Sequence, residues 1–503
     1  MLTEDFLDRF DSELVIGLVA PVGTEKAIII NELKDNLKAF DYDAIIIKLS
    51  GFLKEPNLQK VHNIQLSTEP EVLRINSYMD AGDKVREEMK RGDALALWAV
   101  TEIARLRPPE EQWGEKRAYI LDSLKHPEEI KTLRRVYGNG FFLIGIYSSR
   151  EKRFDFLHRN RNIEEEDAEA LIDRDYNEDK PTNVGQQTRE AFHVADAFVS
   201  LTNPSDAKHQ ISRVIDLFFG HPFTTPTMDE YAMFQAFTAK LRSADLSRQV
   251  GAVILSETGE LIAVGANDVP CYGGGLYWPG DNDHRDYDWG IDSNAKRRDQ
   301  ILSDIVQLVR KKTSNNVDTD EKELLKEVRE GLSHSILLDI TEFGRPVHAE
   351  MEALLSCARI GVSPGMGTLY CTTFPCHTCA KHIVAAGIKR VVYVEPYPKS
   401  KAKELHSDSI EIDEESDDSD KVSFVPFVGV GARRFIDLFS MGLNSGYEMK
   451  RKKQGSIEKV DWKRESAKVR VPMLRTSYLE REKAAASIIA EFYRGEKDEK
   501  EAN

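Results

Sequence analysis

Two short clusters of metal-binding residue types constrain this chain more than any other feature of its sequence. The first contains His348 and Glu350, and the second contains Cys376 and Cys379. One imidazole and two thiolates fill three of the four tetrahedral positions around a zinc ion, and the fourth is left for a water molecule whose pKa falls to about 7. The pattern therefore predicts a zinc ion held by His348, Cys376 and Cys379, with one position open for chemistry.

The local sequence places each cluster at the start of an expected helix. Residues 349–359 are rich in Ala and Leu, which predicts a helix, and residues 367–373 are predicted to form a strand. Pro375 follows where that strand gives way to a second helix. The spacing of Cys376 and Cys379 turns both sulfurs toward one point in the first turn of this helix, whose N-terminus favours thiolates.

Glu350 distinguishes a catalytic zinc site from a structural one. It follows His348 by two residues, so we expect it to face the bound water without binding the metal, and to act first as a base and then as an acid. A structural site would take a fourth ligand from Cys371, His377 or His382, and Glu350 would then have no task. A Cys-x-x-Cys pair alone also fits a redox pair, so the two clusters are informative in combination.

Composition favours an enzyme of the reducing cytosol. At 503 residues the chain is long enough for two or three domains, and its five Cys do not suggest a disulfide framework. The longest apolar runs are too short to cross a bilayer, and no signal peptide is visible. A formal net charge of −16 opposes binding of long phosphate backbones and favours small nucleotides, although a local basic groove on an acidic protein is compatible with it.

The N-terminal part alternates strand-like and helix-like segments, as in a wound α/β domain with a parallel sheet. Residues 14–20 are predicted to be a buried strand, residues 25–40 a helix and residues 43–49 the next strand. A strand that leads through a Gly-containing turn into a helix presents backbone N–H groups to a phosphate. We therefore expect this domain to bind a nucleotide.

The turn itself departs from the P-loop consensus. Gly23 and Thr24 are suited to holding phosphate, but Gly17 comes one residue too early and Lys26 is misplaced for reaching a transferred phosphoryl group. Asp122 ends a predicted strand, where a magnesium-associated acid of a kinase would lie. The sequence thus predicts a nucleotide-kinase-like shape without phosphoryl transfer.

Several segments together resemble a deoxycytidylate deaminase core. They are residues 242–254, Gly265 to Asn267, His348 to Glu350 and Pro375 to Cys379. From about residue 17 to residue 439, the chain resembles bacterial antiviral-defence deaminases in which a degenerate P-loop kinase-like domain precedes the deaminase domain. The resemblance implies a three-layer α/β/α cytidine-deaminase-like fold for the second domain.

The same resemblance implies conversion of dCTP and dCMP to dUTP and dUMP, with depletion of dCTP during phage infection. It also implies control by a small inhibitory RNA and by nucleotides such as dTTP, and a homo-oligomeric cytoplasmic enzyme. Three alternatives stay open: a deaminase of cytosine in RNA or single-stranded DNA, a true kinase with an inactive deaminase domain, and a regulatory nucleotide-binding protein without catalysis.

Five residues are candidates for binding the substrate. Asn267 matches the position that bonds the sugar and base in such deaminases, although an Asn also commonly ends a strand at a turn. Ser247 and Arg248 precede the core strand and are suited to the substrate phosphate, or to an ordinary surface. Tyr397 and Lys399 follow a predicted strand and are suited to stacking on the pyrimidine and reaching phosphate, or to an ordinary loop.

The predicted domains are residues 1–205 for the kinase-like domain and 226–443 for the deaminase domain, followed by an extension at 444–503. The deaminase domain carries an insertion at about 270–345. The insertion opens with residues 270–278, which are rich in Gly and aromatic residues and predict a lid over the site.

Overall fold

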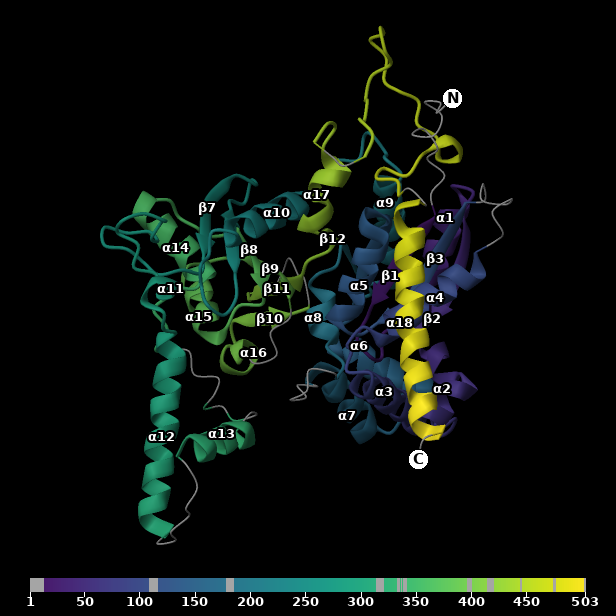
Figure 1. Ribbon diagram of the computed structural model, residues 1–503. Helices are drawn as coiled ribbons and strands as arrows, with labels where there is room; N and C mark the ends of the chain where they lie inside the picture. The colour runs from purple at the N-terminus through teal and green to yellow at the C-terminus, as the bar shows by residue number, and fades with distance from the viewer. Residues whose placement is uncertain are drawn as a thin grey trace. The chain divides into compact units, whose positions relative to one another are not determined.

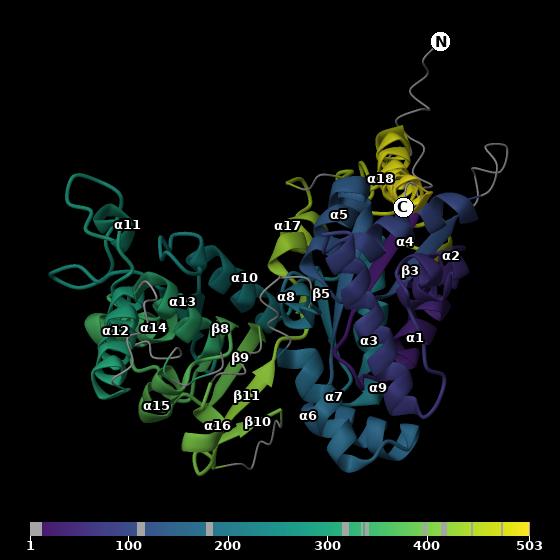
Figure 2. The ribbon, with the colours of Figure 1, turned by 60° about the horizontal axis from the view of Figure 1, so that its bottom comes forward.

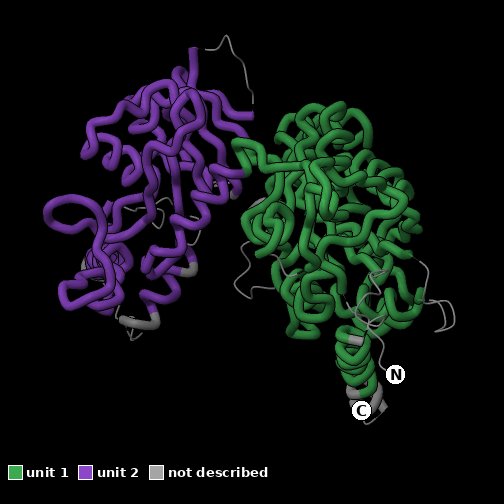
Figure 3. The backbone as a smooth tube through the Cα atoms, turned by 90° about the horizontal axis from the view of Figure 1, so that it is seen from above, with its two compact units in different colours: residues 1–230, 426–503 green, residues 231–425 purple. Residues whose placement is uncertain are grey.

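A computed structural model describes residues 13–107, 116–177, 185–313, 321–332, 335, 337, 342–395, 400–413, 420–443, 446–473 and 476–501. The chain forms two compact units, coloured separately in Figure 3. The first unit combines residues 1–230 with residues 426–503, and the second consists of residues 231–425. Within the described part of the chain, no helix combines the length and the apolar character that crossing a bilayer requires.

The first unit is built on a six-stranded sheet in the order β12-β5-β4-β1-β3-β2. All its neighbouring strands are parallel except β12, which pairs antiparallel with β5. The strands are β1 (Leu14–Val19), β2 (Asp43–Lys48), β3 (Arg117–Leu124), β4 (Phe141–Tyr147), β5 (Ala197–Ser200) and β12 (Gly429–Val430). The predicted wound parallel sheet is thereby confirmed. The chain leaves β1 toward β2 and β3 on one side of it, and later forms β4 and β5 on its other side, so the strand order reverses at β1. In parallel sheets a crevice forms at such a point, at the carboxyl ends of the strands. The turn after β1 lies at this place.

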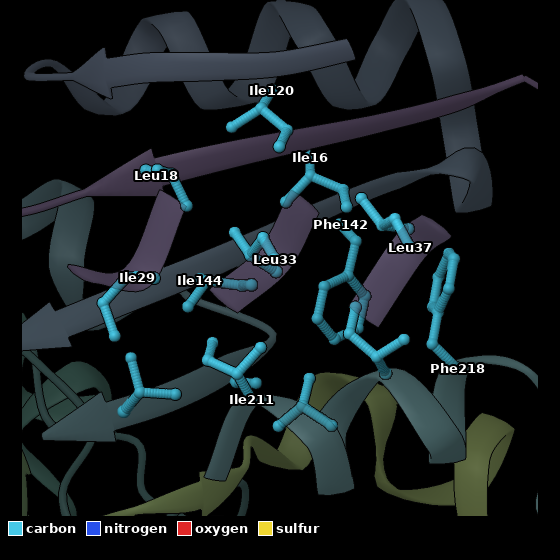
Figure 4. Packing of buried hydrophobic residues seen from close by; sticks show 14 of the residues in the cluster. Ile16, Leu18, Ile29, Leu33, Leu37, Ile120, Phe142, Ile144, Ile211 and Phe218 are labelled. Atoms are coloured by element: carbon cyan, nitrogen blue, oxygen red, sulfur yellow. The ribbon is translucent and has the colours of Figure 1, made fainter. Parts of the chain in front are cut away.

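Helices cover both faces of this sheet (Figure 1). They are α1 (Ala27–Lys38), α2 (Pro56–Val61), α3 (Glu71–Glu88), α4 (Ala94–Leu106), α5 (Pro127–Tyr137), α6 (Arg150–Asp155), α7 (Glu165–Asn177), α8 (Thr188–Phe192), α9 (Pro204–Phe218), α17 (Ala432–Phe439) and α18 (Thr476–Glu501). Figure 4 shows the main core, where Leu33 of α1 and Ile211 of α9 pack with Ile16 and Ile144 of the sheet. Burial of this continuous apolar layer holds the unit together.

The C-terminal stretch returns to the first unit, and the unit boundaries therefore differ from the predicted domain ranges. Gly429 and Val430 form strand β12, and the backbone N–H of the next residue, Gly431, donates to the carbonyl of Asp196. The buried Arg434 of α17 donates to the carbonyls of Asn139 and Phe141, each at 2.7 Å. These contacts are far apart in sequence, and local patterns do not reveal them.

The second unit has its own six-stranded sheet, in the order β10-β11-β9-β8-β6-β7. Figure 2 shows β8, β9, β11 and β10 following one another across it. The strands are β6 (Gly251–Leu255), β7 (Leu261–Ala266), β8 (Thr368–Thr373), β9 (Arg390–Glu395), β10 (Ile410–Ile412) and β11 (Val422–Pro426). β6 and β7 form an antiparallel hairpin, and β8 with β9 is a parallel pair.

Helices pack on both faces of the second sheet, and the insertion adds three more helices to the unit. The helices of the unit are α10 (Met228–Lys240), α14 (Ala349–Ile360), α15 (His377–Ala385) and α16 (Ala402–Leu405), and in the insertion α11 (Asp286–Trp289), α12 (Ser293–Thr313) and α13 (Glu321–Gly331). Gly251 lies against α10, whereas Gly265, paired beside Ala252, lies against α14. Because neighbouring residues of a strand point to opposite faces, α10 and α14 lie on opposite sides of the sheet.

A buried ion network anchors the C-terminal helix of the first unit. The guanidinium of Arg107, just after α4, lies 2.6 Å from Glu482 of α18 and 2.9 Å from Glu13. Tyr478 of α18 donates to Glu13 at 2.6 Å. The three charged side chains are each less than a tenth exposed, so their charges are compensated by one another rather than by water.

We predict that Arg107→Met lowers the free energy of unfolding of the first unit by about 3 kcal/mol, because it leaves Glu13 and Glu482 buried without a cation. Urea unfolding followed by circular dichroism measures the effect. Arg105→Met is the matched control, since Arg105 pairs with Glu102 at the surface, where solvent screens the pair, and its loss should change the free energy of unfolding far less. Equal effects of the two substitutions would contradict the assigned role of Arg107.

Candidate active site

The predicted ligands lie at the N-terminal ends of two neighbouring helices of the second unit. His348 is the extended residue directly before α14, and Cys376 is the extended residue directly before α15. Cys379 lies in the first turn of α15, after the short connection from β8. Helix N-termini carry partial positive charge, so both thiols lie where a thiolate is favoured.

A glycine in β7 allows α14 to approach the sheet closely. A Cβ atom at Gly265 would overlap the carbonyl oxygen of Ala349 and the backbone nitrogen of Ala353, both in α14. Any side chain at Gly265 would therefore push the helix away from the sheet. The start of α14, with His348, lies beside α15 because this contact is possible.

The three ligand side chains converge on one point. Nδ1 of His348 lies 3.4 Å from Sγ of Cys376 and 3.3 Å from Sγ of Cys379, and the three atoms all lie within 4.8 Å of one another. Tetrahedral zinc with ordinary Zn–N and Zn–S bonds separates a nitrogen from a sulfur by about 3.6 Å. The donor types and their spacing therefore fit zinc.

The alternative of a four-ligand structural site finds no support in the geometry. Among the residues that the structure describes, His348, Cys376 and Cys379 form the one such group of metal-binding side chains, and Cys371 and His382 are outside it. His377, the remaining alternative ligand, is also outside the group. Cys376 and Cys379 are not joined by a disulfide bond, so both sulfurs are available to bind a metal.

Hydrogen bonds among the three ligand side chains shift their pKa values in different directions. The hydrogen bond from Cys379, together with His348, lowers the pKa of Cys376 to about 3, despite burial. The hydrogen bond with Cys376 raises the pKa of His348 to about 9. The same sulfur–sulfur hydrogen bond and burial raise the pKa of Cys379 well above its ordinary value. Without metal, the group is thus a thiolate–imidazolium pair beside a neutral thiol.

Glu350 is a buried carboxyl group in the first turn of α14. Only 3% of the residue is exposed, and it lines the same cavity as His348 and Cys376. Burial raises the pKa of Glu350, and the neighbouring His348 opposes that shift. A carboxyl group whose pKa is raised toward neutrality exchanges protons more readily with a neutral substrate.

The cavity beside the ligand group has a volume of about 420 Å³. Asn267, which directly follows β7, lines this cavity. Its side-chain oxygen and nitrogen both form hydrogen bonds with the neighbouring backbone. Its Oδ1 accepts from the N–H of Val250 at 2.6 Å, and its Nδ2 donates to the carbonyl of Arg248 at 2.8 Å. Asn267 therefore shapes the cavity wall, and its predicted bond to substrate stays a prediction.

The predicted phosphate contacts Ser247 and Arg248 also line the cavity. Arg248 Nη2 donates to Thr373 Oγ1 at 2.7 Å. Asp245 accepts from the backbone N–H groups of both Ser247 and Arg248, which fixes their turn. This Asp-x-Ser turn is a recognisable sequence signal that our sequence analysis missed. Tyr397 and Lys399 lie outside the described residues.

The insertion contributes to the cavity through a different part from the one predicted. Residues 270–278 are not among the residues that line the cavity, and Trp278 stacks on Arg242 at 3.8 Å, so a lid formed by this segment stays a prediction. Later insertion residues line the wall, including Asp286, Asp292, Asn294, Arg298 and Glu342. Arg345 holds this wall in place, because it binds Asp286 at 2.7 Å and stacks on Trp289 at 3.5 Å. No local sequence pattern indicates these long-range pairs.

The predicted nucleotide residues of the first unit are divided between a strand and a turn. Gly17 lies inside β1, where a Cβ would contact Leu124 and Phe141, so it packs in the sheet and does not form the turn. Gly23 has a φ of +82° in the turn after β1, and Thr24 follows it. Lys26 precedes α1 and binds Asp122 at the end of β3, at 2.5 Å.

Residues 226–395 match the family model of the cytidine and deoxycytidylate deaminase zinc-binding region. This stretch contains the hairpin, the insertion and all three converging ligands. The matched region is therefore similar to the zinc-binding region of cytidine and deoxycytidylate deaminases, and its His/Cys/Cys group fits the zinc that this description names.

Curated relatives and solved structures resemble parts of the chain. The ComE operon protein 2 of Bacillus subtilis is 38% identical over 91 residues, or 16% of this chain and 48% of that protein. The deoxycytidylate deaminase of Enterobacteria phage T4 is 49% identical over 55 residues, or 11% of this chain and 28% of that enzyme. The chain thus spans less than half the length of these relatives. The dCMP deaminase of cyanophage S-TIM5, solved with dCMP and dUMP, is 17% identical with a TM-score of 0.23, covering 41% of this chain and all of that one.

We predict that the purified chain contains one zinc ion per molecule and that Cys376→Ser removes most of it, because a hydroxyl is a much poorer zinc ligand than a thiolate. Elemental analysis of the purified variants measures the zinc content. Cys271→Ser is the control, since Cys271 is a free thiol outside the ligand group and should leave the zinc content unchanged. Full zinc in the Cys376 variant would refute the assignment.

The protonation states predict that zinc binding to the metal-free protein releases about two protons at pH 7, one from His348 and one from Cys379. Cys376 contributes none, because its lowered pKa already makes it a thiolate. The affinity for zinc should therefore rise with pH, and the rise should become less steep above about pH 9, where His348 has already lost its proton and only Cys379 still has to lose one. Calorimetric titration in buffers of different ionisation enthalpy counts the protons, and release of none would contradict this picture.

Proposed function

We propose that this protein is a zinc-dependent deaminase of deoxycytidine nucleotides that converts dCTP and dCMP to dUTP and dUMP and releases ammonia. The observation that carries the proposal is the buried Glu350 beside the converging His348, Cys376 and Cys379, at a cavity within the family-matched region. The deoxycytidylate deaminases among the relatives support the substrate class.

The residues of the site have separate tasks in this reaction. Zinc, when held by the three ligands, supplies a Lewis acid that activates a water molecule. Glu350 accepts one proton of that water and delivers it to N3 of the cytosine, then takes the second proton from the oxygen added at C4 and passes it to the departing amino group. A C–O bond forms at C4, the C4–N bond breaks, and ammonia leaves, so one water is consumed for each ammonia released. The burial of Glu350 keeps these proton transfers away from bulk solvent.

The cavity wall suits a phosphorylated nucleoside. Arg248, Arg298 and Lys401 each contribute to the lining, and all three carry a positive charge that attracts phosphate. Ser247 and Asn267 line the same cavity and supply polar contacts for the sugar. A cavity of about 420 Å³ also matches the usual size of small-molecule sites. These features support free nucleotides as the substrates.

We also propose that the first unit is a degenerate P-loop kinase-like domain that senses a nucleotide such as dTTP. The parallel sheet and the Gly23 turn before α1 support this role. By family resemblance we propose a cytoplasmic homo-oligomer that depletes dCTP in defence against phage and is inhibited by a small RNA.

We predict that Glu350→Gln lowers ammonia release from dCTP and dCMP by about a thousandfold while zinc content is retained, because an amide cannot transfer the protons. A coupled ammonia assay on zinc-loaded protein measures it. Cytidine-containing single-stranded DNA serves as a third substrate, and activity on the oligonucleotide alone would favour a polynucleotide deaminase instead.

Glu352→Gln is the matched control for this variant. Glu352 lies in the same helix and is also buried, but it binds Arg359 and does not line the cavity. The control should keep close to full activity. Equal loss in both variants, or turnover retained in the Glu350 variant, would refute the role of Glu350.

A further inference from the structure

The turn between β1 and α1 already holds an anion, which belongs to the protein itself. Asp175, near the end of α7, accepts a hydrogen bond from the backbone N–H of Val22 through Oδ2 at 2.7 Å. Val22 lies directly before Gly23 in the turn where the sequence predicts a nucleotide phosphate. Only 3% of Asp175 is exposed, so the carboxylate is held inside the protein.

The other oxygen of this carboxylate has two further donors. Lys125, which follows β3, donates to Asp175 Oδ1 at 2.9 Å and also to the carbonyl of Ala20 at 2.8 Å. The hydroxyl of Thr188, at the start of α8, donates to the same Oδ1 at 3.2 Å. A backbone N–H, an ammonium group and a hydroxyl together are the donor set that proteins use to hold phosphate oxygens.

We propose that the turn at residues 20–26 is a phosphate site that the Asp175 carboxylate fills in the absence of ligand, and that the phosphate chain of a nucleotide binds there by displacing it. This inference rests on the proposed nucleotide-binding role of the first unit and adds how that site is regulated. The resting state is closed by an internal competitor, so occupancy depends on the ligand's own charge and concentration.

Charge and an unused hydroxyl at the same turn support the proposal. Lys26 is neutralised by Asp122 and Lys125 by Asp175, so both cations beside the turn are occupied by internal carboxylates. The hydroxyl of Thr24 is buried and has no hydrogen-bond partner among the residues that the structure describes. A buried hydroxyl without a partner is costly, and a phosphate oxygen at the turn would satisfy it.

The helix that carries Asp175 packs apart from the main core. Leu171 and Ile172 of α7 belong to a small apolar cluster with Met79 and Leu157, and Val22 packs against the same cluster. None of these residues belongs to the core between the sheet, α1 and α9. A movement of α7 that withdraws Asp175 from the turn would therefore disturb this small cluster rather than the main core.

The test is binding of inorganic pyrophosphate to the full chain, measured by calorimetry. Asp175→Asn removes the competing charge at nearly constant size, and it should bind pyrophosphate about tenfold more tightly than the unmodified protein. Asp173→Asn is the matched control, because Asp173 lies in the same helix but is exposed and bound to Arg150. The control should bind as the unmodified protein does.

Adding Lys26→Met to Asp175→Asn locates the new binding. Loss of the gain in affinity places the pyrophosphate at the turn, whereas a retained gain places it elsewhere and overturns the proposal. An Asp175→Asn protein that folds and binds no more tightly also overturns it.

If the Asp175→Asn variant does not fold, Asp175→Ser removes the same charge with a smaller polar side chain and leaves every donor of the turn in place. It should also tighten pyrophosphate binding about tenfold, and unchanged affinity would overturn the proposal. Ammonia release from dCMP by the same preparations separates the two hypotheses, because deamination without a gain in binding refutes only the internal competitor, and the reverse result refutes only the deaminase.

Discussion

The candidate active site depends on the distance at which α14 packs against its sheet. Gly265 sets that distance, since any larger residue would overlap the backbone of the first turn of the helix. That turn contains Glu350 and follows directly on His348, so its position fixes both the metal ligand and the proton carrier relative to α15. The absence of a Cβ atom at Gly265 thus determines how close His348 and Glu350 lie to Cys376 and Cys379, which come from a separate stretch of sequence.

Each unit contains a pair of side chains whose opposite charges compensate each other. In the second unit, Cys376 and His348 compensate each other as a thiolate–imidazolium pair while the third ligand, Cys379, keeps its proton. This arrangement keeps the ligands together and exchanges protons for a divalent cation. In the first unit, Asp175 and Lys125 compensate each other at the turn after β1. The ligand group of the second unit is thus arranged for a metal cation, whereas the turn after β1 in the first unit already holds the Asp175 carboxylate.

The sequence predicted those parts of the structure in which function depends on short-range spacing. The strands around Ile16 and Ile120, the hairpin before Asn267 and the convergence of the ligands follow from local periodicity and from the two clusters. The side chains that hold the insertion wall, such as Arg345, were beyond prediction because each pairs with a residue far along the chain. The role of Asp175 was hidden for the same reason, since nothing near it in sequence marks its bond to Val22.

The first unit is assembled from two stretches of chain that enclose the whole of the second. Its edge strand β12 and its helices α17 and α18 come after the second unit in the chain. A nonsense codon just after residue 425 would spare every candidate metal ligand and yet deprive the earlier sheet of strand β12 and of the helix that carries Glu482. The first unit can therefore finish folding only once the second has been synthesised, so a truncated product would carry the candidate ligands together with an incomplete first unit.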